Sequence, residues 1–175
     1  MENELYVVND KKEEVFLRTK TRPFTINKEG ALSFDGQVVA RKDMTALLQR
    51  MRRIMRIANG VGLSANQIGL PYRLFVAQVP DAQGALKFYA IFNPELEKVS
   101  PETTPLEEGC LSIPGAYGNV DRAKQVTLTG LDKHGRPLRI KAWGLLARVF
   151  QHEVDHLNGK LFIDRTKDIH YAETA

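Results

Sequence analysis

The segment GLLARVFQHEVDHL, residues 144–157, carries the strongest structural signal in this chain of 175 residues. Its apolar residues recur at three- and four-residue spacing, which predicts an amphipathic helix with one buried face. His152 and His156 are four positions apart, so a helix places both imidazoles on one face, close enough to share a metal ion. Glu153 follows the first histidine, where its carboxylate can exchange a proton with a water molecule beside that metal. The segment therefore favours a metal-binding helix over the alternative, two surface histidines without a ligand.

The segments around this helix read mainly as strands joined by turns. Apolar runs between turn residues predict strands over 72–79, 86–93 (closed by Pro94), 125–131 and 138–142. A hairpin is expected over 30–36, and the rest of residues 1–40 reads as extended and irregular. Turns in place of crossover helices indicate an α+β fold, with antiparallel sheets packed around the central helix that carries the His-Glu-x-x-His motif. Because no repeat or linker divides the chain, we expect residues 1–175 to form a single domain.

A second amphipathic helix is expected over residues 41–58, ending at Asn59-Gly60. Residues 41–56 hold six basic side chains and one acidic one, a net charge of +5, so the rest of this +4 chain sums to −1. The simplest interpretation is a solvated basic face. The alternative is attraction to RNA-rich surroundings such as the ribosome, so a ribosome contact through the basic helix 41–58 is a hypothesis.

The composition excludes several classes of protein. No stretch approaches the run of about 20 apolar residues that spans a bilayer, so no membrane partner is expected. The N-terminal residues lack a basic region followed by an apolar core, so they do not read as a secretory signal, and we expect a cytoplasmic location. Cys110 is the only cysteine, which excludes an internal disulfide. A monomer is expected.

A catalytic metal site usually needs three protein ligands, and the helix supplies two. Downstream, only His170 and Glu173 are reasonable candidates for the third. Upstream, Cys110 lies between Gly109 and a short apolar stretch, read as a strand, that ends at Pro114. A lone cysteine is most often a small buried apolar residue, but its thiolate would bind zinc or ferrous iron strongly. The residues alone thus favour Cys110 without excluding the other two.

The segment GVGLSANQ, residues 60–67, follows the basic helix. It lacks the third glycine of a dinucleotide fingerprint and the Gly-Lys-Ser/Thr of a phosphate loop, so nucleotide binding is not expected. Its small residues suggest a backbone that passes close to another group. Gln67 offers an uncharged amide donor, which suits stabilisation of a developing oxyanion.

These three segments, in this order, resemble the polypeptide deformylase family. The family pattern is GxGLAAxQ, then EGCLS, then QHExDH, and this chain has them at 60–67, 108–112 and 151–156. The resemblance covers about residues 40–165. It implies the family's fold and a metal-dependent hydrolase that removes the N-formyl group from the formylmethionine of nascent polypeptides and releases formate.

The resemblance also implies roles for individual residues. Cys110, His152 and His156 would bind one divalent metal ion, typically Fe²⁺, with Zn²⁺, Ni²⁺ or Co²⁺ accepted. Glu153 would act as general base and then general acid, while the Gln67 amide and the backbone N–H of Leu111 would stabilise the oxyanion. Substrate contacts would come from the backbone of Val61, Gly62 and Gly109 and from a methionine pocket lined by Leu106, Leu145 and Val149.

Four further expectations concern the surroundings of these motifs. We predict that Arg122 pairs with Asp155 and braces the metal site. Ser64 replaces the first alanine of the family pattern, and because serine is nearly isosteric with alanine we expect little effect. Tyr117 stands where some members have an arginine. Many members continue into a C-terminal helix implicated in ribosome docking; only 19 residues follow His156 here, so we expect that helix to be absent or very short.

Two other functions stay open on the residues alone. One is a small His-Glu-x-x-His metallopeptidase that cleaves internal peptide bonds, which would give Cys110 no role. The other is a non-enzymatic, ribosome-associated metal-binding module, which would need neither Glu153 nor Gln67.

Overall fold

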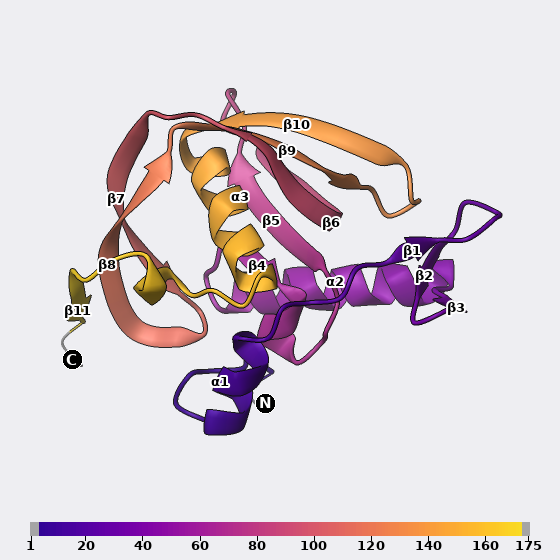
Figure 1. Cartoon of the computed structure of the whole chain (residues 1–175), viewed down its shortest axis with the longest axis horizontal. Coiled ribbons are helices and arrows are strands. Elements are labelled where there is room, and N and C mark those ends of the chain that lie inside the picture. The colour runs from indigo at the N-terminus through magenta and orange to yellow at the C-terminus, as the bar shows by residue number, and fades with distance from the viewer. Residues whose placement is uncertain (1–3, 173–175) are drawn as a thin grey trace.

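The computed structural model describes residues 4–172, which form three antiparallel sheets. Two of these sheets enclose one helix, and the third is a short sheet near the N-terminus. The helices are α1 (Lys11–Leu17), α2 (Arg41–Ile57) and α3 (Gly144–Leu157), with 3-10 turns η1 (Ala65–Ile68) and η2 (Phe162–Asp164). The strands are β1 (Thr25–Ile26), β2 (Leu32–Phe34), β3 (Gln37–Val38), β4 (Gly62–Ser64), β5 (Leu74–Pro80), β6 (Leu86–Val99), β7 (Thr103–Cys110), β8 (Ile113–Ala123), β9 (Gln125–Leu131), β10 (Pro137–Trp143) and β11 (Ile169–Tyr171). Strands β1, β2 and β3 form the short sheet, and Figure 1 shows α3 at the centre, between the other two sheets.

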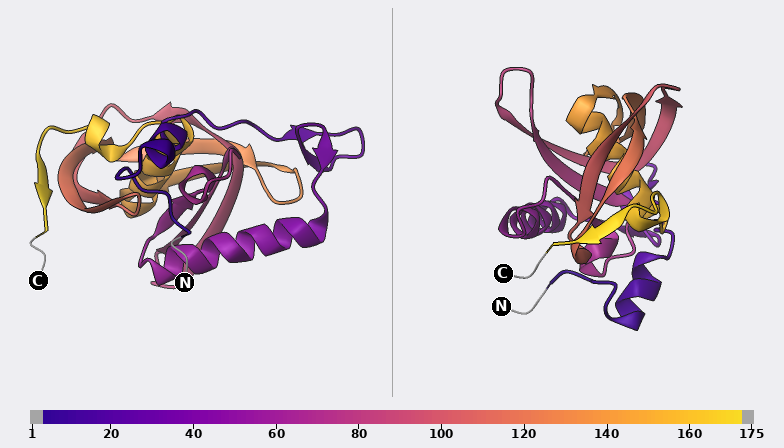
Figure 2. Two further views of the ribbon diagram at one scale, coloured as in Figure 1. Left: turned by 90° about the horizontal axis from the view of Figure 1, so that it is seen from below. Right: turned by 90° about the vertical axis from the view of Figure 1, so that its left-hand side faces the viewer.

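The larger sheet has the strand order β10-β9-β6-β5-β4 and separates α2 from α3. Because side chains alternate between the faces of a strand, β5 serves both sides. Leu74 and Val76 pack into the cluster of apolar residues around α2, whereas Phe75 and Ala77 pack into the cluster around α3. Figure 2 shows α2 running along the edge of the molecule, away from α3. The α3 helix therefore packs against a sheet whose β5 strand is buried on both faces.

The smaller sheet has the order β11-β8-β7 and covers the other side of α3. Its long hairpin pairs Thr103 with Ala123 and continues to Gly109 opposite Tyr117, and the register shifts at Cys110. A third apolar cluster, which includes Ile113, Val120 and Phe162, holds the hairpin in place. The tip of β7 thus brings Cys110 toward the α3 helix.

The expected α+β architecture, with antiparallel sheets around the helix that carries the motif, is confirmed. Helix 144–157 and strand 125–131 have the predicted bounds, and the second helix ends at Ile57, one residue early. The strand expected to end at Pro94 instead continues as β6 to Val99. The pairing with β9 shifts register between Phe92 and Glu95. Pro94, which has no backbone N–H to donate, lies within this irregularity and so interrupts no regular inter-strand hydrogen bond.

Two further sequence expectations were wrong. Residues 1–40 are not all irregular outside the hairpin, because α1 forms there with Asp10 as its N-cap; the Asp10 carboxylate accepts hydrogen bonds from the backbone N–H groups of Lys12 and Glu13. The stretch after Cys110 is not one strand ending at Pro114. Leu111 and Ser112 form the turn between β7 and β8.

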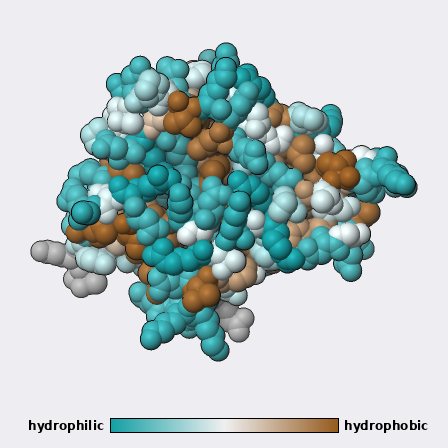
Figure 3. Space-filling model, in the orientation of Figure 1, coloured by the Kyte–Doolittle hydropathy of each residue, from teal (hydrophilic) through white to brown (hydrophobic). Residues whose placement is uncertain are grey.

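The surface and the C-terminal segment complete the description. Hydrophilic residues cover most of the face in Figure 3, where apolar residues form separate patches. Between residues 158 and 172 the chain forms η2 and β11 and no α-helix, as expected for this part. In residues 4–172, no helix is long and apolar enough to cross a membrane.

Candidate metal centre and active site

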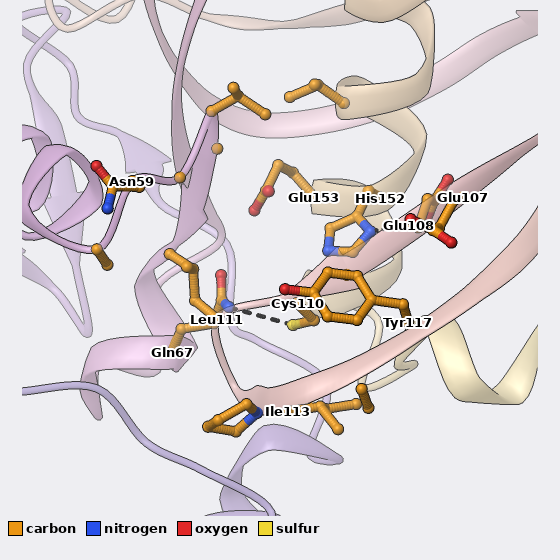
Figure 4. A pocket seen from close by; sticks show the side chains of 18 of the residues that line it. Asn59, Gln67, Glu107, Glu108, Cys110, Leu111, Ile113, Tyr117, His152 and Glu153 are labelled. Atoms are coloured by element: carbon orange, nitrogen blue, oxygen red, sulfur yellow. Dashed lines mark hydrogen bonds and ion pairs between the residues drawn. The ribbon is translucent and has the colours of Figure 1, made fainter. Parts of the chain in front are cut away.

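Three candidate metal ligands converge where the tip of β7 meets α3. The Cys110 Sγ atom lies 3.2 Å from the Nε2 atom of His156, which in turn lies 3.2 Å from the Nε2 atom of His152. The three ligand atoms all lie within 4.8 Å of one another. The two histidines meet because they are about one helical turn apart on α3, whereas Cys110 comes from the end of β7 in the sheet β11-β8-β7. Figure 4 shows Cys110 and His152 side by side at the pocket.

These residues fit a divalent metal ion. A tetrahedral site with metal–sulfur bonds of about 2.3 Å and metal–nitrogen bonds of about 2.0–2.1 Å places neighbouring ligand atoms about 3.3–3.6 Å apart. The observed separations of 3.2 Å are close to this range. The Nδ1 atom of His152 lies 3.0 Å from the Glu108 carboxylate, a contact that makes Nδ1 the donor and leaves Nε2 free to bind the metal. Of the other candidates, His170 pairs with Glu107, and Glu173 lies outside the described residues.

Glu153 lies next to this ligand set, between α3 and β4. The residue is 3% exposed. In β4, residues two apart share a face, so Gly62 and Ser64 both face Glu153, and Leu63 packs into the cluster around α2. A Cβ atom at Gly62 would collide with the Glu153 carboxylate, so only glycine allows this approach. Figure 4 shows the carboxylate pointing from α3 toward that strand.

Gln67 reaches the metal site from η1. Its Oε1 atom accepts a 2.9 Å hydrogen bond from the backbone N–H of Ser64, and this fixes the amide so that Nε2 points toward Cys110 and Ser112. The Nε2 atom lies 3.7 Å from the Cys110 Sγ atom and 3.1 Å from the Ser112 hydroxyl. The amide donor expected from the sequence is thus beside the ligand set, where charge would develop on a substrate carbonyl.

A cavity of about 630 Å³ opens over these groups. Gln67, Leu111, His152 and Glu153 line this cavity. So do all the residues that were expected to contact the substrate, namely Val61, Gly62, Leu106, Gly109, Leu145 and Val149. The carbonyl oxygen of Val61 already accepts a 2.8 Å hydrogen bond from Gln78. The ring of Tyr117 packs against Gly109 and lies over Cys110 in Figure 4. The cavity therefore combines apolar side chains with the polar groups of the candidate site.

A network of buried ion pairs supports the candidate metal ligands. Arg122 pairs with Asp155, as predicted from the sequence, and it also holds Glu108 through two hydrogen bonds of 3.0 Å. Arg148 donates a 2.7 Å hydrogen bond to Glu108, and Arg165 pairs with Asp155. Two carboxylates and two buried guanidinium groups thus compensate one another, which a buried charge requires.

Sequence reasoning did not find two of these contacts. Glu108 is the centre of the ion-pair network and the partner of His152, although the sequence places it only two residues before Cys110. Ser64 donates a 2.7 Å hydrogen bond to the Glu153 carboxylate, so the expectation that it acts as an isosteric alanine overlooked its hydroxyl. A serine at a position where the family pattern has alanine was the available signal for Ser64.

The local environment changes the pKa values of these groups. Burial raises the pKa of Glu108, but hydrogen bonds from His152 and Arg122 outweigh it, and the pKa lies well below the ordinary value. Burial raises the pKa of Glu153 to about 6, although the charge of His152 and the hydrogen bond from Ser64 both act to lower it. Burial lowers the pKa of His156, which favours the neutral imidazole that binds metals. A carboxyl group whose pKa lies near neutrality is suited to accepting and returning a proton.

The α+β fold and this arrangement define a class of protein, the metal-dependent hydrolases. A model of the polypeptide deformylase family matches residues 31–171. The peptide deformylase of Halothermothrix orenii is 42% identical over 149 residues, which cover 85% of this chain and 86% of that protein. The peptide deformylase of Carboxydothermus hydrogenoformans is 48% identical over 123 residues, covering 70% of this chain and 77% of that protein.

Solved structures agree with this relationship. The peptide deformylase of Thermotoga maritima superposes with a TM-score of 0.77 at 34% identity, covering 93% of this chain and 96% of that one. A class I type b peptide deformylase from Acinetobacter baumannii gives a TM-score of 0.78 at 29% identity, covering 93% and 97%. The chain belongs to the polypeptide deformylase family. It is a metal-dependent hydrolase that removes the N-formyl group from formylmethionine at the start of nascent polypeptides, and not one of the two alternatives left open above.

Proposed function

We propose that Cys110, His152 and His156 hold the metal ion and that Glu153 is the general base and then the general acid of deformylation. The observation that carries this proposal is the convergence of one thiol, two imidazoles and a buried carboxylate, of which Cys110, His152 and Glu153 line one cavity. When bound, a divalent cation lowers the pKa of a coordinated water molecule and so makes it a nucleophile near neutral pH.

The protein's own groups then carry the remaining steps. The apolar wall formed by Leu106, Leu145 and Val149 accepts the methionine side chain and directs the formyl carbon toward Glu153. Glu153 takes a proton from the attacking water. The Gln67 amide and the Leu111 backbone N–H stabilise the negative charge on the formyl oxygen. Glu153 next returns the proton to the leaving nitrogen, so that formate and a free amine are the products.

Formate release from formyl-Met-Ala-Ser tests this assignment. The metal-loaded enzyme should release formate, and the Glu153→Ala variant should lose at least about 100-fold in kcat, the lower range for a general acid–base group. The variant should keep its metal, because no ligand is changed. Wild-type turnover by Glu153→Ala would contradict the role of this carboxylate.

For the metal, we propose Fe²⁺ as the native ion. A thiolate with two imidazoles is a donor set that accepts ferrous iron as well as zinc, nickel and cobalt, and geometry alone does not select among them. Elemental analysis of protein purified without oxygen should find one equivalent of iron. One equivalent of zinc in that preparation would contradict the proposal.

We also propose that the basic face of α2 contacts the ribosome. Arg53 and Arg56, with Gln49, Arg52 and Ile57, line a shallow surface groove on this helix. The face is partly neutralised, since Glu4 pairs with Arg50 and Arg53.

Pelleting with large ribosomal subunits tests this contact. Replacement of Arg53 and Arg56 by serine should reduce binding, and the effect should shrink at high salt because it is electrostatic. Arg139→Ser, which removes an exposed arginine of β10 that pairs with Glu97, is the matched control. Equal pelleting of all three proteins would exclude the contact.

Finally, we propose that residues 1–175 work as one catalytic domain, as a monomer in the cytoplasm. Location in the cytoplasm fits a substrate that is a nascent chain, and the separate apolar patches on the face in Figure 3 support a monomer. Sedimentation equilibrium should give a mass near 19.7 kDa. A mass twice that value would contradict the monomer.

A further inference from the structure

A buried hydroxyl contacts the carboxylate of Glu153. Ser64 closes β4 and has no exposed surface. Its Oγ atom lies 2.7 Å from the Oε2 atom of Glu153 and 3.1 Å from the backbone carbonyl oxygen of the same residue. A hydroxyl has one proton to donate, and the shorter contact leads to the charged acceptor. The hydroxyl proton is therefore committed to Glu153.

The hydrogen bond from Ser64 fixes the orientation of the Glu153 carboxylate. Within residues 4–172, Ser64 is the only group that donates a hydrogen bond to it. The other oxygen, Oε1, faces the Gly62 backbone at the cavity wall. Because Ser64 occupies Oε2, Oε1 is the oxygen that stays available to the cavity.

We propose that Ser64 is a positioning residue that holds Oε2 of Glu153 and keeps Oε1 directed at the reacting water. The inference rests on the proposed role of Glu153 as the general base. A carboxylate anchored at one oxygen loses rotational freedom and reaches the water in one geometry. Proton transfer depends steeply on that geometry, whereas binding of the peptide does not.

A purely structural role for the hydroxyl would change folding and stability, whereas a positioning role changes kcat. The backbone N–H of Ser64 holds the Gln67 side-chain amide, and replacement by alanine keeps that contact. The variant loses the capping contact between the Ser64 side chain and the Gln67 backbone at the start of η1, and this structural loss is measured as a lower melting temperature. Alanine also stands at this position in the family pattern, so the Ser64→Ala variant should fold. Catalysis in members with alanine further means that the effect of losing the hydroxyl is partial.

The experiment measures kcat, KM, metal content and thermal stability of three variants on formyl-Met-Ala-Ser. Ser64→Ala should lower kcat about tenfold, on the order expected for one hydrogen bond to a charged group, with KM and metal content unchanged. Ser64→Thr keeps the hydroxyl and should retain most of the wild-type kcat. Ser33→Ala removes a buried serine hydroxyl of β2 that has no partner within the described residues, and it should leave kcat, KM and metal content unchanged.

The results separate this inference from the proposed function. An unchanged kcat for Ser64→Ala, with Glu153→Ala inactive, would overturn the role of Ser64 and leave that of Glu153 intact. A fall in metal content or in melting temperature that accounts for the lost activity would also overturn it, as would a Ser64→Thr variant that folds but is as slow as Ser64→Ala. Full activity of Glu153→Ala would refute the proposed function itself.

Discussion

Replacing Glu108 by glutamine tests the buried network that supports the metal site. The Glu108 carboxylate accepts hydrogen bonds from Arg122 at 3.0 Å and from Arg148 at 2.7 Å, and it lies 3.0 Å from Nδ1 of His152. Glutamine has almost the same shape but no charge. The substitution therefore leaves Arg148 without a carboxylate and leaves Asp155 as the only carboxylate paired with Arg122.

The expected cost follows from the burial of this network. Breaking a buried ion pair by removing one partner costs about 3–5 kcal/mol, and we take about 3 kcal/mol because the glutamine oxygen still accepts one hydrogen bond. For a domain of this size, each kcal/mol lowers the melting temperature by roughly 2–4 °C, so the variant should melt about 10 °C below the wild type. Loss of the carboxylate behind His152 should also weaken metal binding by about 10- to 100-fold.

Thermal melting followed by circular dichroism and competition with a chromophoric chelator measure the two effects. Glu107→Gln is the matched control, because this neighbouring carboxylate is 56% exposed and pairs with His170 at the surface. The control should melt within about 1 °C of the wild type, since exposed ion pairs contribute little. If Glu108→Gln matched the control in both assays, the network would not be what holds the metal site.

Three other substitutions have defined outcomes. Gly62→Ala should lower kcat about 100-fold by displacing the Glu153 carboxylate; normal turnover would show that the strand can move aside. Arg122→Ala should weaken metal retention by about tenfold or more, since it removes a partner of both Glu108 and Asp155; unchanged metal content and activity in dialysed protein would refute that support. Cys110→Ser should abolish metal retention in elemental analysis, because a serine hydroxyl is not ionised at neutral pH; a stoichiometric metal content would exclude the thiolate as a ligand.

The sequence predicted helices and strands correctly where a clear apolar periodicity was present. The helix over 144–157 and the strand over 125–131 have their predicted bounds, because each combines a clear apolar period with a turn at its end. The short α1 helix was missed although Asp10 caps it, because seven residues give too little periodicity to recognise. The β6 strand passes Pro94 through a bulge that depends on its neighbour β9, which no local pattern contains.

For the candidate site, too, some features could be predicted from the sequence and others could not. Motif spacing indicated the two histidines and Glu153 and favoured Cys110 and Gln67, and the structure places these five residues close together. The hydrogen bond from Ser64 to Glu153 joins residues 89 positions apart. Its existence depends on how closely β4 approaches α3.

The sequence by itself determined the kinds of donor atom and the spacing of the two histidines on one helix face, because helical geometry follows from local chain order. Only the tertiary structure decided that the Cys110 Sγ atom lies 3.2 Å from His156 and that Glu108 is the partner of His152. These distances come from two sheets packing against α3. That packing is set by the burial of many distant apolar side chains at once, which no single segment encodes.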